Sequence, residues 1–293
     1  MPKISQKLKL TILFLAITLF LFSAFVWLKS AQNKNLEVIF FDVGQGDSIL
    51  IRTPDKNNIL IDGGEDSTVL YKLGKYLPFY DKTIDLMILT HPHSDHVGGL
   101  VGVLKRYNVQ NVLSAGVVHT SPDYLEWLEI IKEKKINFIK AGGYKKIKFS
   151  SDANGQSEIA LEILYPQKDI SQDSFDDLNS SSVVSKLTFG KNSFLFMGDL
   201  PIQGEKELIK IGADLRADVL KVGHHGSKYS SSLEFLEAVN PRYAVIQVGK
   251  NNKFGHPSMR TILNLEKKNI KVLRDDELGD IIINSDGKDL ILR

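Results

Sequence analysis

Short apolar runs alternate with polar turns from residue 36 to the C-terminus, and a single much longer apolar run precedes them. The long run, residues 10–28, contains no charged residue and is interrupted only by two threonines and a serine. At about 1.5 Å per helical residue it is long enough to cross a hydrocarbon core of about 30 Å. It predicts a transmembrane helix, with an N-terminal segment at 1–9 and a polar linker at 29–35.

Lysines flank this apolar run on both sides, with a slight excess on the N-terminal side. Positive charge favours the cytoplasmic side of a membrane, so the pattern predicts a cytoplasmic N-terminus and places the rest of the chain outside the cell. The small-x-small pattern of a signal-peptidase site is poor at 22–24 and at 29–31. We therefore expect an uncleaved anchor in the cell membrane rather than a removed signal peptide.

The remaining chain, 36–293, is expected to form one domain in which strands and helices alternate. Apolar runs bounded by Gly, Asp and Asn predict strands at 38–41, 48–52, 58–61, 84–89, 161–164, 183–189, 194–197, 218–222 and 243–248. Helical spacing of apolar residues predicts helices at 67–77, 98–107, 124–134 and 232–239. An irregular acidic loop is expected around 155–179, and short strands at 271–293. This alternation is typical of an α/β fold.

Composition narrows the chemistry that this domain can perform. The chain has no cysteine, which excludes disulfides, thiolate zinc sites and a cysteine nucleophile. Residues 1–35 contain five lysines and no acidic residue, so the rest holds 32 basic and 35 acidic residues, a net charge of −3. The domain thus lacks the overall positive charge of a typical nucleic-acid-binding protein, and any polyanion would have to bind locally.

Three of the seven histidines lie in one hexapeptide, His91-Pro92-His93-Ser94-Asp95-His96, directly after a strongly apolar strand. Imidazole nitrogens and a carboxylate suit zinc, manganese or iron. The spacing allows His91 and His93 to reach one ion, and Asp95 and His96 to reach a second. Two such ions, about 3.5–4 Å apart, can activate water and polarise an ester oxygen. The hexapeptide therefore predicts a dinuclear metal site.

Other candidate ligands also follow apolar strands. Asp62, Asp199 and the pair His224-His225 each stand just after the C-terminal end of a predicted strand, as the hexapeptide does. Side chains that emerge from such strand ends converge at one edge of a sheet. We expect Asp62 to hydrogen-bond a ligand histidine or the loop backbone. Adjacent histidines point in different directions, so one of the pair is expected to bind metal and the other to face the substrate.

These motifs resemble those of the metallo-β-lactamase fold superfamily, and more finely the hydrolase domain of ComEC-type DNA-internalisation competence proteins. The resemblance spans residues 36–293 and is carried by segments 41–48 (FDVGQGDS), 60–64 (LIDGG), 91–96 (HPHSDH), 195–199 (LFMGD), 220–227 (LKVGHHGS) and 255–258 (GHPS). It implies a four-layer α/β/β/α sandwich that holds two divalent ions, zinc or manganese. It also implies that Asp199 bridges the two ions.

The resemblance has two departures. Wider relatives place another histidine between the metal loop and the bridging aspartate, whereas the only histidine in that interval, His119, lies too early and is taken as incidental. The finer family has an Asn/Ser-rich stretch instead, which 179–182 matches, so the first metal is expected either to be weakly held or to have its coordination completed by water. ComEC-type proteins also carry a membrane channel of many helices and a small β-barrel domain. This chain has one apolar helix there, so DNA transport by this polypeptide alone is not expected.

The remaining candidates concern substrate. His256 is expected to contact a phosphate or to donate a proton to the leaving group, and Asp95 is a catalytic candidate as well as a ligand. Candidate substrate contacts are Asn179, Ser227 and Lys228. Four lysines near the later histidines could form a local positive rim, namely Lys221, Lys228, Lys250 and Lys253.

The sequence thus predicts a membrane-anchored, extracellular, metal-dependent hydrolase whose leading substrate class, by resemblance, is a phosphodiester, with extracellular DNA as a candidate. A related alternative is hydrolysis of a cell-envelope phosphoester, a β-lactam or another ester. A third is a non-catalytic anchored accessory that binds DNA or an uptake machine.

Overall fold

The computed structural model describes residues 5–31, 35–150 and 158–293, which fall into two compact units, Met1–Asn35 and Leu36–Arg293. Three predicted segments lie partly outside the described residues. These are the N-terminal segment at 1–4, the linker at 32–34 and the start of the acidic loop at 155–157.

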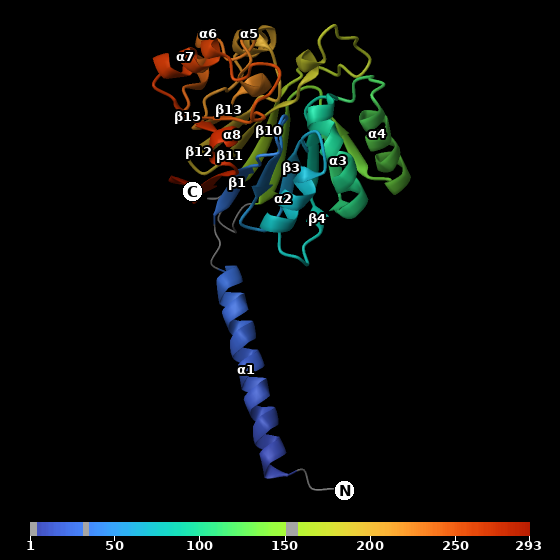
Figure 1. Cartoon of the computed structure of the whole chain (residues 1–293), viewed down its shortest axis with the longest axis vertical. Coiled ribbons are helices and arrows are strands. Elements are labelled where there is room, and N and C mark those ends of the chain that lie inside the picture. Colours follow the sequence, from blue (N-terminus) through green and yellow to red (C-terminus); the bar gives the residue numbers. More distant parts are fainter. Residues whose placement is uncertain (1–4, 32–34, 151–157) are drawn as a thin grey trace. The chain divides into compact units, whose positions relative to one another are not determined.

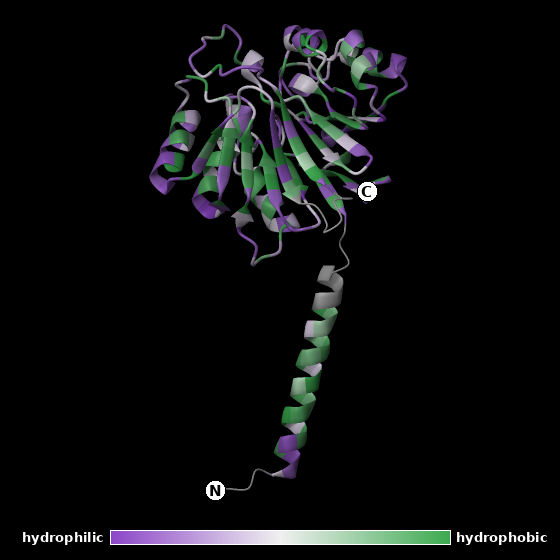
Figure 2. Ribbon diagram, turned by 180° about the vertical axis from the view of Figure 1, so that it is seen from behind, coloured by the Kyte–Doolittle hydropathy of each residue, from purple (hydrophilic) through white to green (hydrophobic). Residues whose placement is uncertain are grey.

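The first unit contains helix α1 (Gln6–Ala31), which includes the whole apolar run predicted to span a membrane. Its segment Gln6–Val26 has a mean hydropathy of 2.3 and is not buried, and Figure 2 shows a predominantly hydrophobic helix with hydrophilic residues at its N-terminal end. By length and composition this helix can cross a membrane, a property that a signal sequence shares.

The second unit is built around two mixed sheets that pack face to face (Figure 1). The first sheet has the order β17-β16-β1-β2-β3-β5-β7-β8. Its strands are β1 (Leu36–Phe40), β2 (Ile49–Arg52), β3 (Asn58–Ile61), β5 (Leu86–Leu89), β7 (Asn111–Ser114), β8 (Asn137–Lys140), β16 (Ile281–Ser285) and β17 (Leu290–Leu292). From β3 to β8 neighbouring strands are parallel, so their C-terminal ends lie at one edge.

The second sheet has the order β15-β14-β13-β12-β11-β10-β9. Its strands are β9 (Lys145–Ser150), β10 (Ile159–Tyr165), β11 (Val184–Phe189), β12 (Asn192–Phe196), β13 (Val219–Lys221), β14 (Tyr243–Ile246) and β15 (Lys271–Arg274). The run from β12 to β15 is parallel, which again collects C-terminal strand ends at one edge. A small parallel pair, β4 (Thr83–Ile84) and β6 (Asn108–Val109), lies apart from both sheets.

Helices cover the outer face of each sheet and complete a four-layer α/β/β/α sandwich, which confirms the predicted architecture (Figure 1). The first sheet is covered by α2 (Thr68–Tyr76), α3 (Ser94–Arg106) and α4 (Pro122–Lys134), and the second by α5 (Ile202–Lys210), α6 (Leu233–Val239) and α7 (Met259–Lys267). Short helices complete the unit, namely α8 (Asp275–Leu278), η1 (Leu178–Ser181) and η2 (Gly223–Gly226).

The central strands are apolar without alternation because both of their faces are buried. In β1, Val38 and Phe40 lie in the core between the sheets, whereas Ile39 packs in the core beneath the helices. In β12, Phe194 belongs to the core between the sheets and Leu195 to the core under α5 and α6. Strands that are covered on both faces need continuous apolar runs, which is the pattern that the sequence shows.

The structure corrects several predicted boundaries. Helix α3 begins at Ser94 rather than at residue 98, so half of the predicted metal loop is helical. The tail contains the one-turn helix α8 among its strands, and β10 (Ile159–Tyr165) is longer at both ends than the strand predicted at 161–164. Helices α5 and α7 cover the second sheet although the sequence pattern did not single them out.

A partly buried carboxylate holds α2 against the edge of the first sheet. Asp280, just before β16, accepts hydrogen bonds from the Asp42 N–H (3.0 Å), Lys72 Nζ (2.6 Å), Lys75 Nζ (2.9 Å) and the Tyr76 hydroxyl (2.9 Å). Burial alone would raise the pKa of Asp280, but these donors hold it below its ordinary value.

We expect Asp280→Asn to lower the free energy of unfolding by about 2 kcal/mol at pH 7, since it removes charge-assisted hydrogen bonds. The folded-state pKa lies below the unfolded value of about 4, so this contribution is present above pH 4 and is lost as the pH falls through the folded-state pKa. The difference between wild type and variant should therefore shrink in acid. Urea unfolding of the full chain in detergent micelles, followed by near-UV circular dichroism, measures it. Asp173→Asn, which removes only an exposed pair with Lys168, is the matched control.

Candidate metal centre

The hexapeptide is positioned by a close approach between α3 and the end of β3. His93 stands at the N-cap position of α3 with an extended backbone, and Asp95 and His96 lie in the first helical turn. A Cβ atom on Gly99 would lie 2.1 Å from the Gly63 carbonyl oxygen, so only glycine permits this contact. The His96 carbonyl accepts a hydrogen bond from the Gly63 N–H at 2.8 Å, which fixes the helix against the strand end.

Asp62 lies at that strand end and orients His96. Its carboxylate accepts hydrogen bonds from the Thr90 N–H (2.8 Å), the Thr90 hydroxyl (2.7 Å) and His96 Nδ1 (2.8 Å). Asp62 is fully buried and has a φ of 56°, in the left-handed region that Asp tolerates better than most residues. With Nδ1 of His96 occupied, its Nε2 is left to face the centre of the site.

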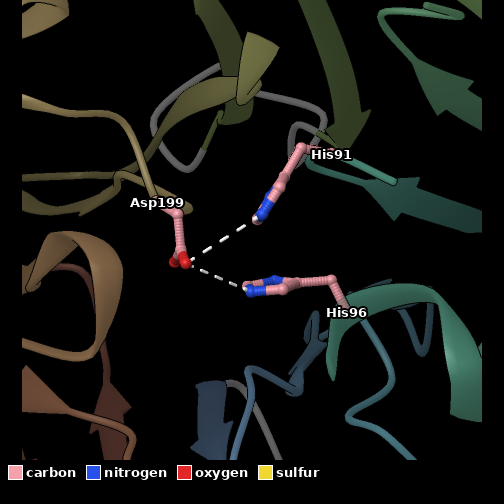
Figure 3. Close-up of side chains that lie close together, drawn as sticks. All are labelled: His91, His96 and Asp199. Atoms are coloured by element: carbon pink, nitrogen blue, oxygen red, sulfur yellow. Dashed lines mark ion pairs between the residues drawn. The ribbon is translucent and has the colours of Figure 1, made fainter. Parts of the chain in front are cut away.

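Asp199, after β12 on the second sheet, meets these histidines from the opposite side. Its Oδ2 lies 4.0 Å from His91 Nε2 and 3.5 Å from His96 Nε2, and Figure 3 shows both rings directed at the carboxylate. His93 Nδ1 lies 3.0 Å from His91 Nε2, so the third histidine of the hexapeptide adjoins the same group. Asp199 does not cap α5, whose N-cap is Pro201.

The second half of the cluster is formed by Asp95 and His225. His225 Nε2 lies 3.3 Å from Asp95 Oδ2 and 3.4 Å from Asp199 Oδ2, while its Nδ1 donates to the Gln247 carbonyl at 2.9 Å. The neighbouring His224 is further out: its Nε2 is 3.9 Å from Asp199 and its side chain is partly exposed. Both histidines have a positive φ, 49° and 51°, which turns consecutive side chains to different sides of the site.

The donor atoms fit divalent cations. His91, His96 and Asp199 offer ligand atoms within 4.8 Å of one another, and so do Asp95, His96 and His225. His96 Nε2, His225 Nε2 and Asp199 Oδ1 are buried and make no hydrogen bond with any described residue. A buried polar atom without a partner is costly, and coordination to a cation would satisfy all three.

The pKa shifts within the cluster also indicate that positive charge is stabilised there. Burial alone would lower the pKa of His96, but Asp199, Asp62 and Asp95 hold it well above its ordinary value. Burial would raise the pKa of Asp199, yet His225 and His96 hold it well below the usual range. The Asp199 carboxylate therefore remains ionised and stabilises cations beside it, whether imidazolium or metal.

Asp47 and Lys221 form a buried ion pair behind the cluster. Lys221 Nζ lies 2.6 Å from Asp47 Oδ2 with both side chains almost wholly buried, and Asp47 Oδ1 is 3.3 Å from His225 Nδ1. Lys221 is thus not part of a positive surface rim, because its ammonium neutralises Asp47 in the interior. Asp47 was not predicted to be a site residue, although its position in the glycine-rich turn of segment 41–48 could have indicated that it is one.

A pocket of about 280 Å³ opens onto the cluster. Asn179 and His256 line it, and burial, His224 and His225 lower the pKa of His256 to about 4, so its imidazole is neutral at neutral pH. The pocket is lined by Gln45, His93, Ser94, Asp95, Asn179, Asp199, His224, His225, Phe254 and His256.

Three other candidates lie outside the lining of this pocket. The buried Ser227 hydroxyl accepts a hydrogen bond from the Tyr229 N–H at 3.3 Å, within its own turn. Lys228 is exposed, with its ammonium 5.0 Å from the Tyr229 ring centroid. His119 lines a separate, mostly apolar pocket of about 430 Å³ beside α4. Its Nδ1 lies 3.1 Å from the Ser121 hydroxyl.

A four-layer sandwich with a buried cluster of histidines and aspartates at the shared edge of its two sheets is the architecture of metal-dependent hydrolases. The chain belongs to the Metallo-beta-lactamase superfamily, whose family model matches residues 41–250.

The chain is related to competence proteins. It is 31% identical to ComE operon protein 3 of Bacillus subtilis (strain 168), covering 84% of this chain and 32% of that protein. It is also 31% identical to Competence protein ComA of Neisseria gonorrhoeae, over 86% of this chain and 32% of the relative. It therefore spans about a third of the length of these relatives. Among solved structures, a long form RNase Z from yeast matches with a TM-score of 0.44 at 15% identity, covering 76% of this chain and 38% of that one.

We expect Asp62→Asn to weaken metal binding about 10- to 100-fold, because loss of an outer partner of a ligand histidine has this typical effect. Asparagine keeps the size of the side chain and tolerates the positive φ, so the fold should be retained. Competition with a chromophoric chelator for Zn²⁺ measures the affinity, and His119→Ala serves as the control. An unchanged affinity in Asp62→Asn would show that Asp62 does not act through His96.

We expect Lys221→Met to lower the free energy of unfolding by about 3–5 kcal/mol, since it leaves Asp47 charged and buried without its partner. The double variant Asp47→Asn/Lys221→Met should recover at least about 1 kcal/mol of this loss, because the stranded charge is gone. Chemical denaturation of Lys221→Met, Asp47→Asn and the double variant, in parallel with wild type, gives the coupling. Additive losses would mean that the two side chains do not stabilise one another.

Proposed function

We propose that the domain hydrolyses phosphodiesters with the help of divalent metal ions, and that α1 anchors it to the outer face of the cell membrane. The observation that carries the catalytic part is the position of Asp199, which joins the two halves of the cluster at the floor of an accessible pocket. The resemblance to DNA-internalisation competence proteins supports a phosphodiester substrate, and the competence proteins among the relatives support the same class.

In this proposal, separate sets of residues hold the metal and orient its ligands. Asp199 and His225 would hold the metal together with four residues of the hexapeptide. These are His91, His93, Asp95 and His96. Asp62 and the Gln247 carbonyl fix the tautomers of His96 and His225, so that each presents Nε2. Bound divalent ions would supply Lewis-acid activation of water and of a phosphoryl oxygen.

Residues at the mouth of the pocket would position the substrate. The buried Asn179 Oδ1 has no hydrogen-bond partner among the described residues, so this oxygen can accept a hydrogen bond from a ligand. His256 Nδ1 is likewise unpartnered there, and its neutral ring can donate one hydrogen bond to a phosphoryl oxygen. His224, partly exposed above Asp199, faces the substrate in this arrangement. Burial would raise the pKa of Asp95, but His96 and His225 hold it below its ordinary value, so Asp95 would act as an ionised ligand and not as an acceptor of a released proton.

The proposed localisation depends on α1 and its flanking lysines. The uncharged apolar run 10–28 lies within the helix, and Lys3, Lys7 and Lys9 precede that run. Under the positive-inside rule its N-terminus stays in the cytoplasm and the domain lies outside. Protease treatment of intact cells that express a C-terminally tagged chain tests this orientation: the tag should be lost from the outside and recovered in the membrane fraction without protease.

We expect the purified full chain in detergent micelles, loaded with Zn²⁺ or Mn²⁺, to hydrolyse bis-(p-nitrophenyl) phosphate. Asp199→Asn and His225→Ala should each lower turnover by more than about 100-fold, since direct ligands contribute more than the outer partners whose loss costs about 10- to 100-fold. His119→Ala should keep wild-type turnover. Metal content measured on the same samples separates lost metal from lost chemistry.

The outcomes separate the rival functions. A metal-loaded protein that opens nitrocefin and leaves phosphodiesters intact would be a lactamase and would overturn the proposal. A cellular function that persists in Asp199→Asn would identify a non-catalytic accessory.

A further inference from the structure

One wall of the metal pocket is a loop, residues 249–257, that a single side chain holds in shape. Asn252 Nδ2 donates to the carbonyls of Gly249 (3.0 Å) and His256 (2.7 Å), and its Oδ1 accepts from the N–H groups of Phe254 (3.1 Å) and His256 (3.0 Å). The loop also contacts the turn between β1 and β2 of the first sheet, where the Gly249 N–H donates to Gln45 Oε1 at 3.2 Å. The loop therefore presents its side chains from a fixed backbone.

Phe254 stands on this loop with 55% of its surface exposed, and it lines the same pocket as Asp199 and His225. Its ring stacks on His256 with centroids 5.9 Å apart and planes 18° apart. The His256 ring in turn meets His224 edge to face, at 5.5 Å and 72°. A row of rings thus leads from the metal cluster towards the solvent and ends on the half-exposed Phe254 ring.

The charge beside the Phe254 ring determines which kind of ligand can bind against it. The exposed Lys253 ammonium lies over the Phe254 ring, with Nζ 5.3 Å from the ring centroid, so a phosphate would have to draw it aside before a base stacks there. A second cation, such as a quaternary ammonium head group, would be repelled there. A neutral planar base attached to phosphates suits both features, because the base stacks on the ring and the phosphate pairs with the ammonium.

We propose that Phe254 is a stacking platform for an unpaired nucleobase next to the scissile phosphodiester, and that Lys253 binds a flanking phosphate. This inference rests on the phosphodiesterase function proposed above. Base pairs in a duplex hide their faces from such a ring, so the site takes single-stranded nucleic acid or frayed ends rather than intact duplex.

The test measures binding by the full chain in detergent micelles with fluorescence anisotropy, using a labelled thymidine dodecamer and an abasic dodecamer of the same length. Phe254→Ala should weaken binding of the thymidine strand roughly 5- to 100-fold, as expected for loss of one stacked base, and leave the abasic strand unchanged. Phe254→Trp should keep the wild-type affinity. Phe79→Ala, which removes a still more exposed ring outside the pocket lining, should change the affinity for neither strand.

Lys253→Gln provides a second, independent readout. It should weaken both strands alike and reduce the magnitude of the slope of log affinity against log salt by about 0.7, the effect of one phosphate contact on a single strand. A base-specific loss in Lys253→Gln would contradict its assignment to phosphate.

Two results would overturn the platform, and they are distinguishable. If wild type hydrolyses bis-(p-nitrophenyl) phosphate but Phe254→Ala binds both strands as wild type does, the platform is wrong and the phosphodiesterase function stands. If wild type neither binds the strands nor hydrolyses phosphodiesters, the platform and the proposed function are both wrong.

Discussion

Buried negative charge at the shared edge of the two sheets is the constraint around which this domain is built. Asp47, Asp62 and Asp199 have almost no exposure, and each is balanced by a cationic or hydrogen-bonding partner from another element. The Asp47–Lys221 pair joins the turn before β2 in the first sheet to the end of β13 in the second. Because uncompensated charge in the interior is costly, the two sheets must meet in one register for the centre to exist.

Much of this arrangement could be predicted from the sequence because it depends on local patterns. Strands buried on both faces are continuous apolar runs, so the sequence indicates where they lie. Because parallel strand ends gather at one edge, the proximity of the hexapeptide, Asp199 and His225 could be predicted from their positions after such strands. The choice between His224 and His225 could not follow, because it depends on two consecutive positive φ angles and on a carbonyl supplied by Gln247.

Other features required the tertiary structure. Gly98 and Gly99 indicate a weak helix start, yet the packing of α3 against the end of β3 stabilises helix from Ser94 onward. A lysine in a motif rich in glycine and histidine looks like surface charge, but only the folded chain shows that Lys221 faces Asp47. Long-range pairing of buried ions leaves no periodic signal, which is why both residues of this pair were misjudged or missed.

The loop at 249–257 has a consequence beyond the reaction itself. Its ends are tied to the sheets and to Gln45, while its interior is organised by Asn252 alone and makes no contribution to the buried ion pairs. Its tip can therefore be exchanged as a cassette, in evolution or in protein engineering, without disturbing the residues that would coordinate cations. Preference for one polymer over another would then diverge quickly on a scaffold whose reactive machinery stays the same.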